Sequence, residues 1–110
     1  MNSPNTARIR ALNDALRQTG KGGQLLATSG VSALGPLFLM EVCTAMAAFT
    51  AFDEDNDPHS EHDFGALDLA GHRVVWKIDY YDRSMTAGAD NPADPETCQR
   101  VLTIMLAEEY

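Results

Sequence analysis

The fold of this chain is decided by residues 64–81, which read FGALDLAGHRVVWKIDYY. Two β-type runs, 64–69 and 73–81, flank a short spacer, Ala70-Gly71-His72, of the tight-turn kind. Within the second run, Val74, Trp76, Ile78 and Tyr80 alternate with Val75, Lys77, Asp79 and Tyr81. Alternation puts the first set on one face of a strand and the second set on the other. The stretch therefore predicts a β-hairpin with one apolar face.

Upstream of the hairpin, the pattern predicts a helix, a strand and a second helix. The first helix begins at Ser3-Pro4 or at Thr6, and glycines at 20, 22 and 23 end it. Its apolar face is formed by Ile9, Leu12 and Leu16. Residues 24–28 are short and apolar, which predicts a buried strand. Residues 32–50 are apolar around most of a helical circumference, which is typical of a central, buried helix.

Downstream of the hairpin, residues 94–110 are predicted to form a final helix. Asp94 is a suitable N-cap and Pro95 suits the first helical position. The helix would carry an apolar stripe made of Cys98, Val101, Leu102, Met105 and Leu106. The predicted order is α-β-α-β-β-α. We therefore expect an α+β fold, a two-layer sandwich with helices on one face of a small sheet of about three strands. With 110 residues, the chain has the size of a single domain, residues 1–110.

Charge is unevenly distributed along the chain. The sequence holds 16 Asp and Glu against 8 Lys and Arg, a net charge of −8. Residues 52–96 carry twelve acids against three bases, whereas residues 1–23 have a net charge of +3. A negative field repels nucleic acid and favours cationic partners or metal ions. We therefore expect a basic protein partner and no direct nucleic-acid binding. The alternative interpretation is that the charge only keeps the protein soluble.

No segment has the composition of a membrane span or of a secretion signal. The longest nearly apolar stretch, residues 31–52, is interrupted by polar residues and contains no run near the ~20 apolar residues that a bilayer requires. The first residues of the chain are polar, unlike the apolar centre of a signal peptide. We expect a cytoplasmic protein that makes no contact with a membrane.

The segment between the second helix and the hairpin holds most of the chemistry. Residues 53–63, DEDNDPHSEHD, contain six acids and two histidines, and we call them the acidic loop. Alternate aspartates at its start resemble a calcium-binding EF-hand loop. The resemblance then fails, because Pro58 replaces the required Gly and Phe64 replaces the bidentate Glu. An EF-hand is therefore not expected.

His62 and Asp63 are the candidate metal ligands, because imidazole with carboxylate suits zinc, manganese or iron. The start of one hairpin strand lies beside the end of the other, so we expect both residues near Asp79 and Asp82. His59 is close enough in sequence to share an ion. The alternative interpretation is a solvated loop in which Asp63 caps a turn and His62 bonds to a backbone carbonyl. The sequence identifies no cofactor.

Four stretches resemble a known family. They are IRALND (residues 9–14), FDEDNDPHSEHDFG (52–65), WKIDYYD (76–82) and NPADPETCQRVLTIMLAEEY (91–110). The chain resembles an uncharacterised family of small, mostly alphaproteobacterial proteins of unknown function. The resemblance implies that the gene lies near plasmid or phage genes. It implies no activity, cofactor or catalytic residue.

These observations lead to three functional hypotheses. The leading one is a non-catalytic interaction protein whose acidic face docks a basic partner. On a mobile element, such a protein would inhibit a nucleic-acid-targeting defence system, of the anti-restriction or anti-CRISPR type. Its candidate partner-binding residues are Asp53, Glu54, Asp55, Asp57, Glu61, Asp79 and Asp82. The alternative is a small metal-dependent hydrolase that uses His62 and Asp63 with Asp79 or Asp82. The third is a homodimer paired through the second or last helix. No catalytic residue is assigned.

Overall fold

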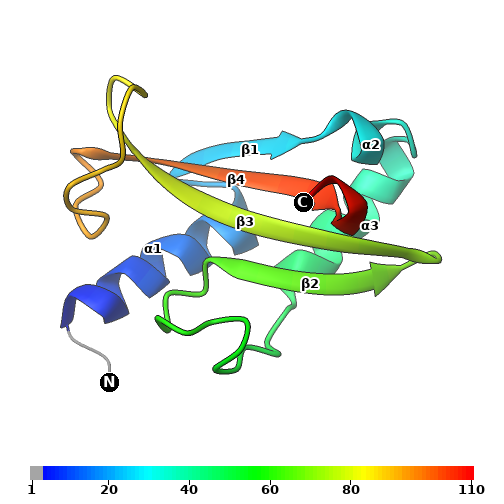
Figure 1. Cartoon of the computed structure of the whole chain (residues 1–110), viewed down its shortest axis with the longest axis horizontal. Helices are drawn as coiled ribbons and strands as arrows, with labels where there is room; N and C mark the ends of the chain where they lie inside the picture. Colours follow the sequence, from blue (N-terminus) through cyan, green and yellow to red (C-terminus); the bar gives the residue numbers. More distant parts are fainter. Residues whose placement is uncertain (1–3) are drawn as a thin grey trace.

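The computed structural model describes residues 4–110, which form helices and one four-stranded mixed sheet (Figure 1). The elements in chain order are α1 (Pro4–Thr19), β1 (Gly23–Ala27), α2 (Ser29–Ser32), α3 (Pro36–Ala47), β2 (Phe64–Leu69), β3 (His72–Asp82), β4 (Cys98–Leu106) and the 3-10 helix η1 (Ala107–Glu109). The strand order is β1-β4-β3-β2. β1 runs parallel to β4, and the other neighbours are antiparallel. The predicted α+β class is confirmed.

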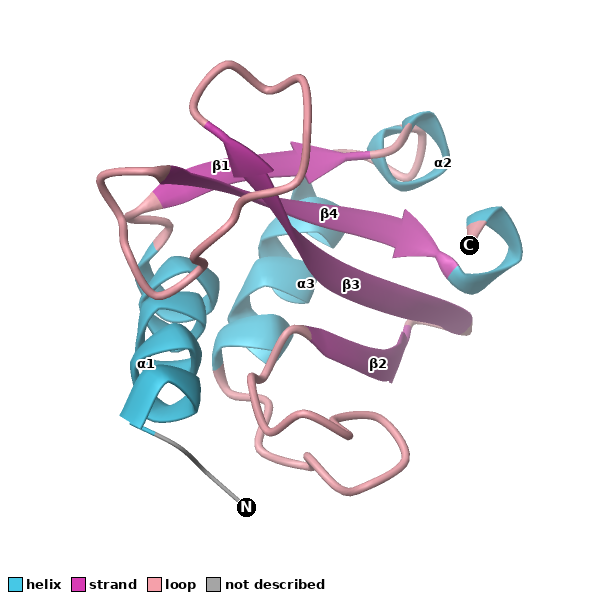
Figure 2. Ribbon diagram, turned by 60° about the vertical axis from the view of Figure 1, so that its left-hand side comes forward, coloured by secondary structure: helices cyan, strands magenta, loops and turns pink. Residues whose placement is uncertain are grey.

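The two long helices, α1 and α3, lie on the same side of the sheet (Figure 2). The core fills the space between this helix layer and the sheet. It consists of Leu16, Val31, Phe38, Val42, Met46, Val74, Trp76, Ile78, Leu102 and Ile104. The β3 side chains in it are the apolar set that the alternation predicted, and Tyr80 packs against them. Burial of this face therefore fixes which way the hairpin is turned.

The predicted hairpin is confirmed. Leu69 pairs with His72, so only Ala70 and Gly71 connect the strands. Both have positive φ values, 50° and 81°. Two consecutive residues in this region form the turn type whose twist matches that of antiparallel strands. The first helix is also found, beginning at Pro4. Ser3, the other predicted starting point, lies outside the described residues.

The predicted final helix is wrong. Residues 98–106 form β4, and only Ala107–Glu109 are helical, so the sheet has four strands and not about three. β4 lies between β1 and β3, and its residues on both faces are mostly buried. A strand of this kind has no polar face, so its apolar residues follow one another without alternation. The same run also places apolar residues at helical spacing, and periodicity cannot separate the two.

At Asp94, where the sequence predicts the start of a helix, the chain forms only a single hydrogen-bonded turn. The Asp94 carbonyl accepts hydrogen bonds from the backbone N–H groups of Thr97 and Cys98, at 3.2 and 3.0 Å. Its carboxylate Oδ1 accepts one from the Glu96 N–H, at 2.9 Å. The capping residues therefore do what their chemistry predicts, but the chain then enters the sheet because a place between β1 and β3 buries it on both faces.

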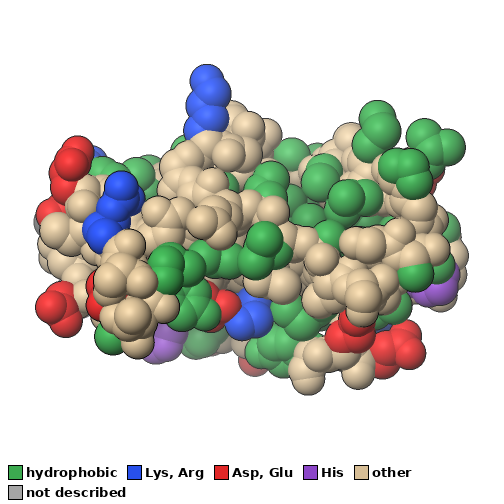
Figure 3. Space-filling model, turned by 90° about the horizontal axis from the view of Figure 1, so that it is seen from above, with side chains coloured by type: hydrophobic (Ala, Val, Ile, Leu, Met, Phe, Trp, Pro, Cys, Tyr) green, Lys and Arg blue, Asp and Glu red, His purple; other side chains and the backbone are tan. Residues whose placement is uncertain are grey.

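Two predictions of burial are also wrong. β1 is an edge strand, and its Leu25 and Leu26 are 43% and 50% exposed. α3 is shorter than residues 32–50 and is separated from α2 by Gly35, whose φ is 97°. It buries only one side, leaving Leu37 and Met40 72% and 64% exposed. Figure 3 shows hydrophobic side chains standing out from the surface. An all-apolar circumference predicts full burial only where a further layer covers the helix.

Glu109, near the C-terminus, has a structural role. The Glu109 carboxylate accepts hydrogen bonds from Thr28 Oγ1 at 2.6 Å and from the backbone N–H groups of Gly30 and Leu106, at 3.2 and 2.9 Å. These bonds, the Thr28 bond foremost, hold the pKa of Glu109 below its ordinary value. Glu109 therefore ties the end of the chain to the start of α2.

The side chain of Trp76, which lies opposite Gly65 on the neighbouring strand, requires a glycine at position 65. The two residues pair across β2 and β3, and a Cβ at Gly65 would lie 2.6 Å from ring atoms of Trp76. We expect Gly65→Ala to reduce the free energy of unfolding by about 1–3 kcal/mol, because the ring must move in a packed core. Gly88→Ala is the control, since its Cβ would have no neighbour nearer than 3.8 Å. Urea unfolding measures both, and equal losses would contradict the steric explanation.

The Glu109 contacts predict a pH-dependent stabilisation. We expect Glu109→Gln to lower the melting temperature at neutral pH, because charge-assisted hydrogen bonds are lost. A lowered carboxyl pKa contributes stability above the ordinary Glu range and loses it as pH falls through the lowered pKa. The difference from the unmodified protein should therefore shrink in acid. Glu108→Gln, at the exposed neighbouring residue, should have little effect at any pH. A difference that persists unchanged in acid would refute this role.

Candidate functional site

The acidic loop is attached to α1 by residues that lie 50 and 48 positions apart in sequence. Arg10 donates a hydrogen bond from Nη1 to the Ser60 carbonyl at 2.9 Å. Asn13 donates from Nδ2 to the Glu61 carbonyl at 3.0 Å. In Figure 1 the loop is the green segment between α3 and β2. Contacts of α1 with the loop backbone therefore hold the segment that carries most of the predicted site.

Two aspartates of the loop build its backbone. Oδ1 of Asp53 accepts hydrogen bonds from the N–H groups two and three residues later, both at 2.9 Å. Oδ1 of Asp57 accepts from the N–H groups four and five residues later, at 2.9 and 3.0 Å. Asp57 is only 7% exposed. Aspartate commonly closes turns in this way. The conformation of the loop is therefore specified by its own acids.

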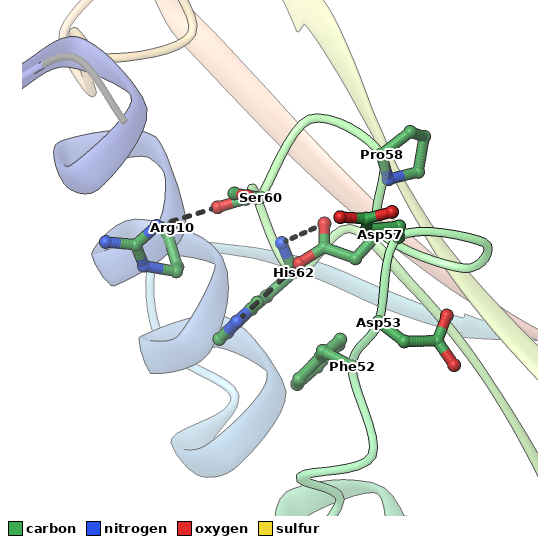
Figure 4. A pocket seen from close by; sticks show the side chains of 8 residues that line it. Arg10, Phe52, Asp53, Asp57, Pro58, Ser60 and His62 are labelled. Carbon is green, nitrogen blue, oxygen red and sulfur yellow. Dashed lines mark hydrogen bonds and ion pairs between the residues drawn. The ribbon is translucent and has the colours of Figure 1, made fainter. Parts of the chain in front are cut away.

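His62 lies between two carboxylates. Its Nδ1 is 2.9 Å from Oδ1 of Asp14 on α1. Its Nε2 is 3.7 Å from Oδ2 of Asp57 (Figure 4). The imidazole stacks on the Phe52 ring, with centroids 3.8 Å apart and planes 3° from parallel. The backbone φ is 55° at His62 and 58° at Ser60. For a residue other than glycine, this region costs about 1 kcal/mol or more. Contacts of the side chain therefore hold His62 in a strained backbone conformation.

A depression of about 650 Å³ lies between the loop and α1. It is lined by Arg10, Phe52, Asp53, Glu54, Asp57, Pro58, Ser60 and His62. In Figure 4, Arg10 enters from α1 and the other labelled side chains come from the opposite wall. One guanidinium and an imidazole face three carboxylates. This combination suits a polar group that carries positive charge.

A buried arginine lies beneath the loop. Arg17 is 4% exposed. Its Nη1 donates to the carbonyls of Met46, Ala47 and Phe49 at 2.8, 3.2 and 3.0 Å, which closes the C-terminal end of α3. Its Nη2 donates to Asp14 at 2.8 Å. The guanidinium also lies over the Phe52 and Trp76 rings, 5.3 and 5.7 Å from their centroids. Arg17 therefore positions the carboxylate that contacts His62.

A second buried polar network joins β3, β4, α1 and the loop. Arg100 is 2% exposed, and its Nε donates to Oδ1 of Asn13 at 2.7 Å. Nδ2 of Asn13 donates to the Tyr80 hydroxyl at 2.7 Å, and that hydroxyl donates to Oε1 of Glu61 at 2.8 Å. Burial lowers the pKa of Arg100 and raises the pKa of Tyr80. Glu61 therefore has a structural role, as the hydrogen-bond acceptor for the Tyr80 hydroxyl.

Asp63 faces a different depression, of about 440 Å³. It shares this depression with Asp79, which forms an ion pair with Lys77 at 2.5 Å. Burial, with a smaller effect from Glu61, raises the pKa of the Asp63 carboxyl. Asp63 and Asp79 thus lie at one depression, as the hairpin geometry predicts, while the His62 ring faces α1.

The two predicted metal ligands line separate depressions. Within residues 4–110, no group of three or more His, Cys, Asp or Glu could hold a metal ion. Asp82 is engaged in the turn that follows β3, where its Oδ1 accepts from Ser84 Oγ at 2.8 Å and from the Thr86 N–H at 3.1 Å. These bonds, the Ser84 bond foremost, lower the pKa of Asp82.

The predicted partner-binding acids divide into two groups. Asp57, Glu61, Asp79 and Asp82 have the partners described above. Asp53, Glu54 and Asp55 are exposed. In the part of the chain that the structure describes, none of these three forms an ion pair. The exposed negative charge of the loop is therefore concentrated at its beginning.

Sequence reasoning missed the polar residues of α1 that hold the site. Asn13 lies four residues after Ile9 and three before Leu16, so it falls on the apolar face of the helix. Its 0% exposure follows from that position. Arg17 follows Asn13 by four residues and so continues the same face. A polar residue on an apolar stripe was the available signal for a buried network.

A family model described as "Protein of unknown function (DUF3768)" matches residues 27–109. The chain belongs to this family. The DUF3768 match includes the acidic loop, the hairpin and β4, but it does not include α1. Comparisons with curated proteins and with solved structures gave no match. Within residues 4–110, no helix has the length and apolar content needed to cross a membrane.

The Tyr80 hydroxyl provides a test of the buried network. We expect Tyr80→Phe to lower the free energy of unfolding by about 1–2 kcal/mol, because Glu61 loses a donor and Asn13 an acceptor away from water. The control is Tyr81→Phe, the next residue, which points to the opposite face of β3. Urea unfolding of both variants measures the difference. A loss at Tyr81 as large as that at Tyr80 would contradict the network.

Proposed function

We propose that this chain is a non-catalytic interaction protein that docks a basic protein partner through the acidic loop. The observation that carries the proposal is the contrast within the loop. Asp57 is buried and fixes the backbone, whereas Glu54 and Asp55 are exposed and form no ion pair within residues 4–110. Exposed carboxylates on a fixed backbone are a surface suited to recognising positive charge.

Preorganisation supports this proposal. A loop that is already held by hydrogen bonds loses less conformational entropy on binding than a mobile one. The surrounding segment, residues 52–96, has a net charge of −9, which accelerates encounter with a cationic surface. The depression beside Asp53 and Glu54 offers a lysine or arginine of the partner a polar site. We expect the two proteins to meet in the cytoplasm.

The inhibitor form of the proposal specifies the partner further. The partner would be an enzyme of a nucleic-acid-targeting defence system, and the chain would occupy the basic surface that binds nucleic acid. Two features support this form of the proposal: the negative charge of residues 52–96, and the proximity to plasmid or phage genes that the sequence resemblance implies. Docking is preferred to metal-dependent hydrolysis because His62 and Asp63 line separate depressions.

An oligoarginine peptide with a fluorescent label is the probe for this function. We expect the double variant Glu54→Gln, Asp55→Asn to bind it at least about threefold more weakly, because two exposed charges are lost at the docking surface. The matched control is Asp90→Asn, Glu96→Gln, which removes the same charge at exposed positions outside the loop. Fluorescence anisotropy measures the affinities.

The same titration at about 50 and about 200 mM salt should show weaker binding at the higher concentration, because exposed charges are screened. Equal losses in the two double variants would show that net charge, and not the acidic loop, binds the peptide. Binding that does not respond to salt would argue against an electrostatic docking surface.

A further inference from the structure

β1 is an edge strand that lacks the usual protection against further pairing. It is the outermost strand on its side of the sheet, and no described strand lies beyond it (Figure 1). Its sequence, GQLLA, has no charged residue and no proline, which are the residues that commonly protect such edges. The other edge strand, β2, carries a charge at the exposed Asp68. Figure 3 views the molecule from the side of β1 and shows hydrophobic side chains across its middle.

The free hydrogen-bonding groups of β1 follow from its pairing with β4. The Thr28 N–H donates to the Ile104 carbonyl at 3.0 Å, so the backbone groups of residue 28 face β4. Successive residues of a strand direct their N–H and C=O groups to opposite sides. Gly23, Leu25 and Ala27 therefore direct theirs to the open edge. These groups lie symmetrically about Leu25, the central residue of the strand.

We propose that β1 pairs with β1 of a second copy of this chain, antiparallel about a twofold axis at Leu25. In this register Leu25 lies opposite Leu25 of the second copy, and Gly23 lies opposite its Ala27. The residues whose backbone groups point outward then meet one another, as the hydrogen-bonded pairs of an antiparallel ladder must. The two sheets become one continuous sheet, and both open edges are satisfied.

The side chains of β1 suit this pairing. Leu25 lies on the same face of the sheet as Leu102, which the helices cover, whereas Leu26 lies on the opposite face with Thr103. The two leucines are 43% and 50% exposed. The pairing brings Leu25 against its own copy on one face and Leu26 against Gln24 of the second copy on the other. Exposed apolar surface is therefore removed from water on both faces of the edge.

Complementary charges at the two ends of β1 identify a second copy as the occupant. Lys21 precedes the strand. Glu109 lies at its other end, where it accepts hydrogen bonds from Thr28 Oγ1 and the Gly30 N–H. Both charged side chains are exposed, and neither forms an ion pair within residues 4–110. Antiparallel pairing brings Lys21 of each copy beside Glu109 of the other, because every contact across a twofold axis is reciprocal.

The surface on β1 is separate from the acidic loop, which leads into β2 at the other edge of the sheet. The pairing therefore does not rest on the proposed function, and it differs from the dimer through helices that the sequence suggested. A dimer of this kind carries two acidic loops, and linking two binding sites raises the overall affinity for a partner that can engage both.

Cysteine cross-linking tests the register. Opposed residues of a hydrogen-bonded antiparallel pair have Cα atoms about 5.5 Å apart, which a disulfide can span. We expect Leu25→Cys to give a covalent dimer under mild oxidation, with mass spectrometry showing a link between the two residues 25. The matched control is Leu26→Cys, which should stay monomeric on a non-reducing gel because it lies opposite Gln24 and not opposite itself. The unmodified protein, with Cys43 and Cys98, is the blank. Equal cross-linking of the two variants, or none in Leu25→Cys, would overturn the proposal.

Sedimentation equilibrium tests the association without any engineered bond. We expect a monomer–dimer equilibrium in the unmodified protein. Its dissociation constant should rise about tenfold in Lys21→Glu, because two exposed ion pairs become like-charge contacts. The matched control is Arg73→Glu, which makes the same change of charge at an exposed position beside the opposite edge strand and should have a much smaller effect. An unmodified protein that is monomeric at every concentration would overturn the proposal, as would equal weakening in the two variants.

Discussion

The burial of Arg17 is the constraint on which the arrangement of the helices and the loop depends. A guanidinium removed from water must be paired with charge and hydrogen-bond acceptors, or its burial is strongly unfavourable. Here the acceptors are the carbonyls at the end of α3 and the carboxylate of Asp14. Satisfying them fixes α1 against α3 and sets the point from which the chain leaves α3. The acidic loop begins at Asp53, four residues after Phe49, whose carbonyl accepts from Arg17.

Some acids of the loop stabilise its conformation, and others are exposed at its surface. Asp57 and Glu61 hold the loop in place, one through backbone N–H groups and the other through the Tyr80 hydroxyl. Glu54 and Asp55 are then exposed on a framework that their own side chains do not build. A chain of small size can afford little disorder at a binding surface, because its core supplies only modest stability. Hydrogen bonds to the carboxylates of Asp53 and Asp57 order the loop without drawing on the stability of the core.

Particular elements show how far sequence could predict the fold and the site. The hairpin was predictable because one face of β3 is buried by the helices, so its side chains alternate in polarity. β4 was not, because a strand with neighbours on both sides and both faces mostly buried has no alternation to detect. The acidic loop was recognised as the candidate site from composition. Its partners on α1 were missed, because nothing in local periodicity connects His62 to Asp14, 48 residues earlier.

The sequence by itself determined the first helix, the hairpin with its turn, and the concentration of acids between α3 and β2. Each of these follows from the conformational preferences and polarity of residues close together in the chain. The tertiary structure alone decided that residues 98–106 enter the sheet, that β1 lies at its edge, and that His62 and Asp63 line separate depressions. These outcomes depend on burial and on hydrogen-bond satisfaction between distant segments, and those energies exist only once the chain has folded.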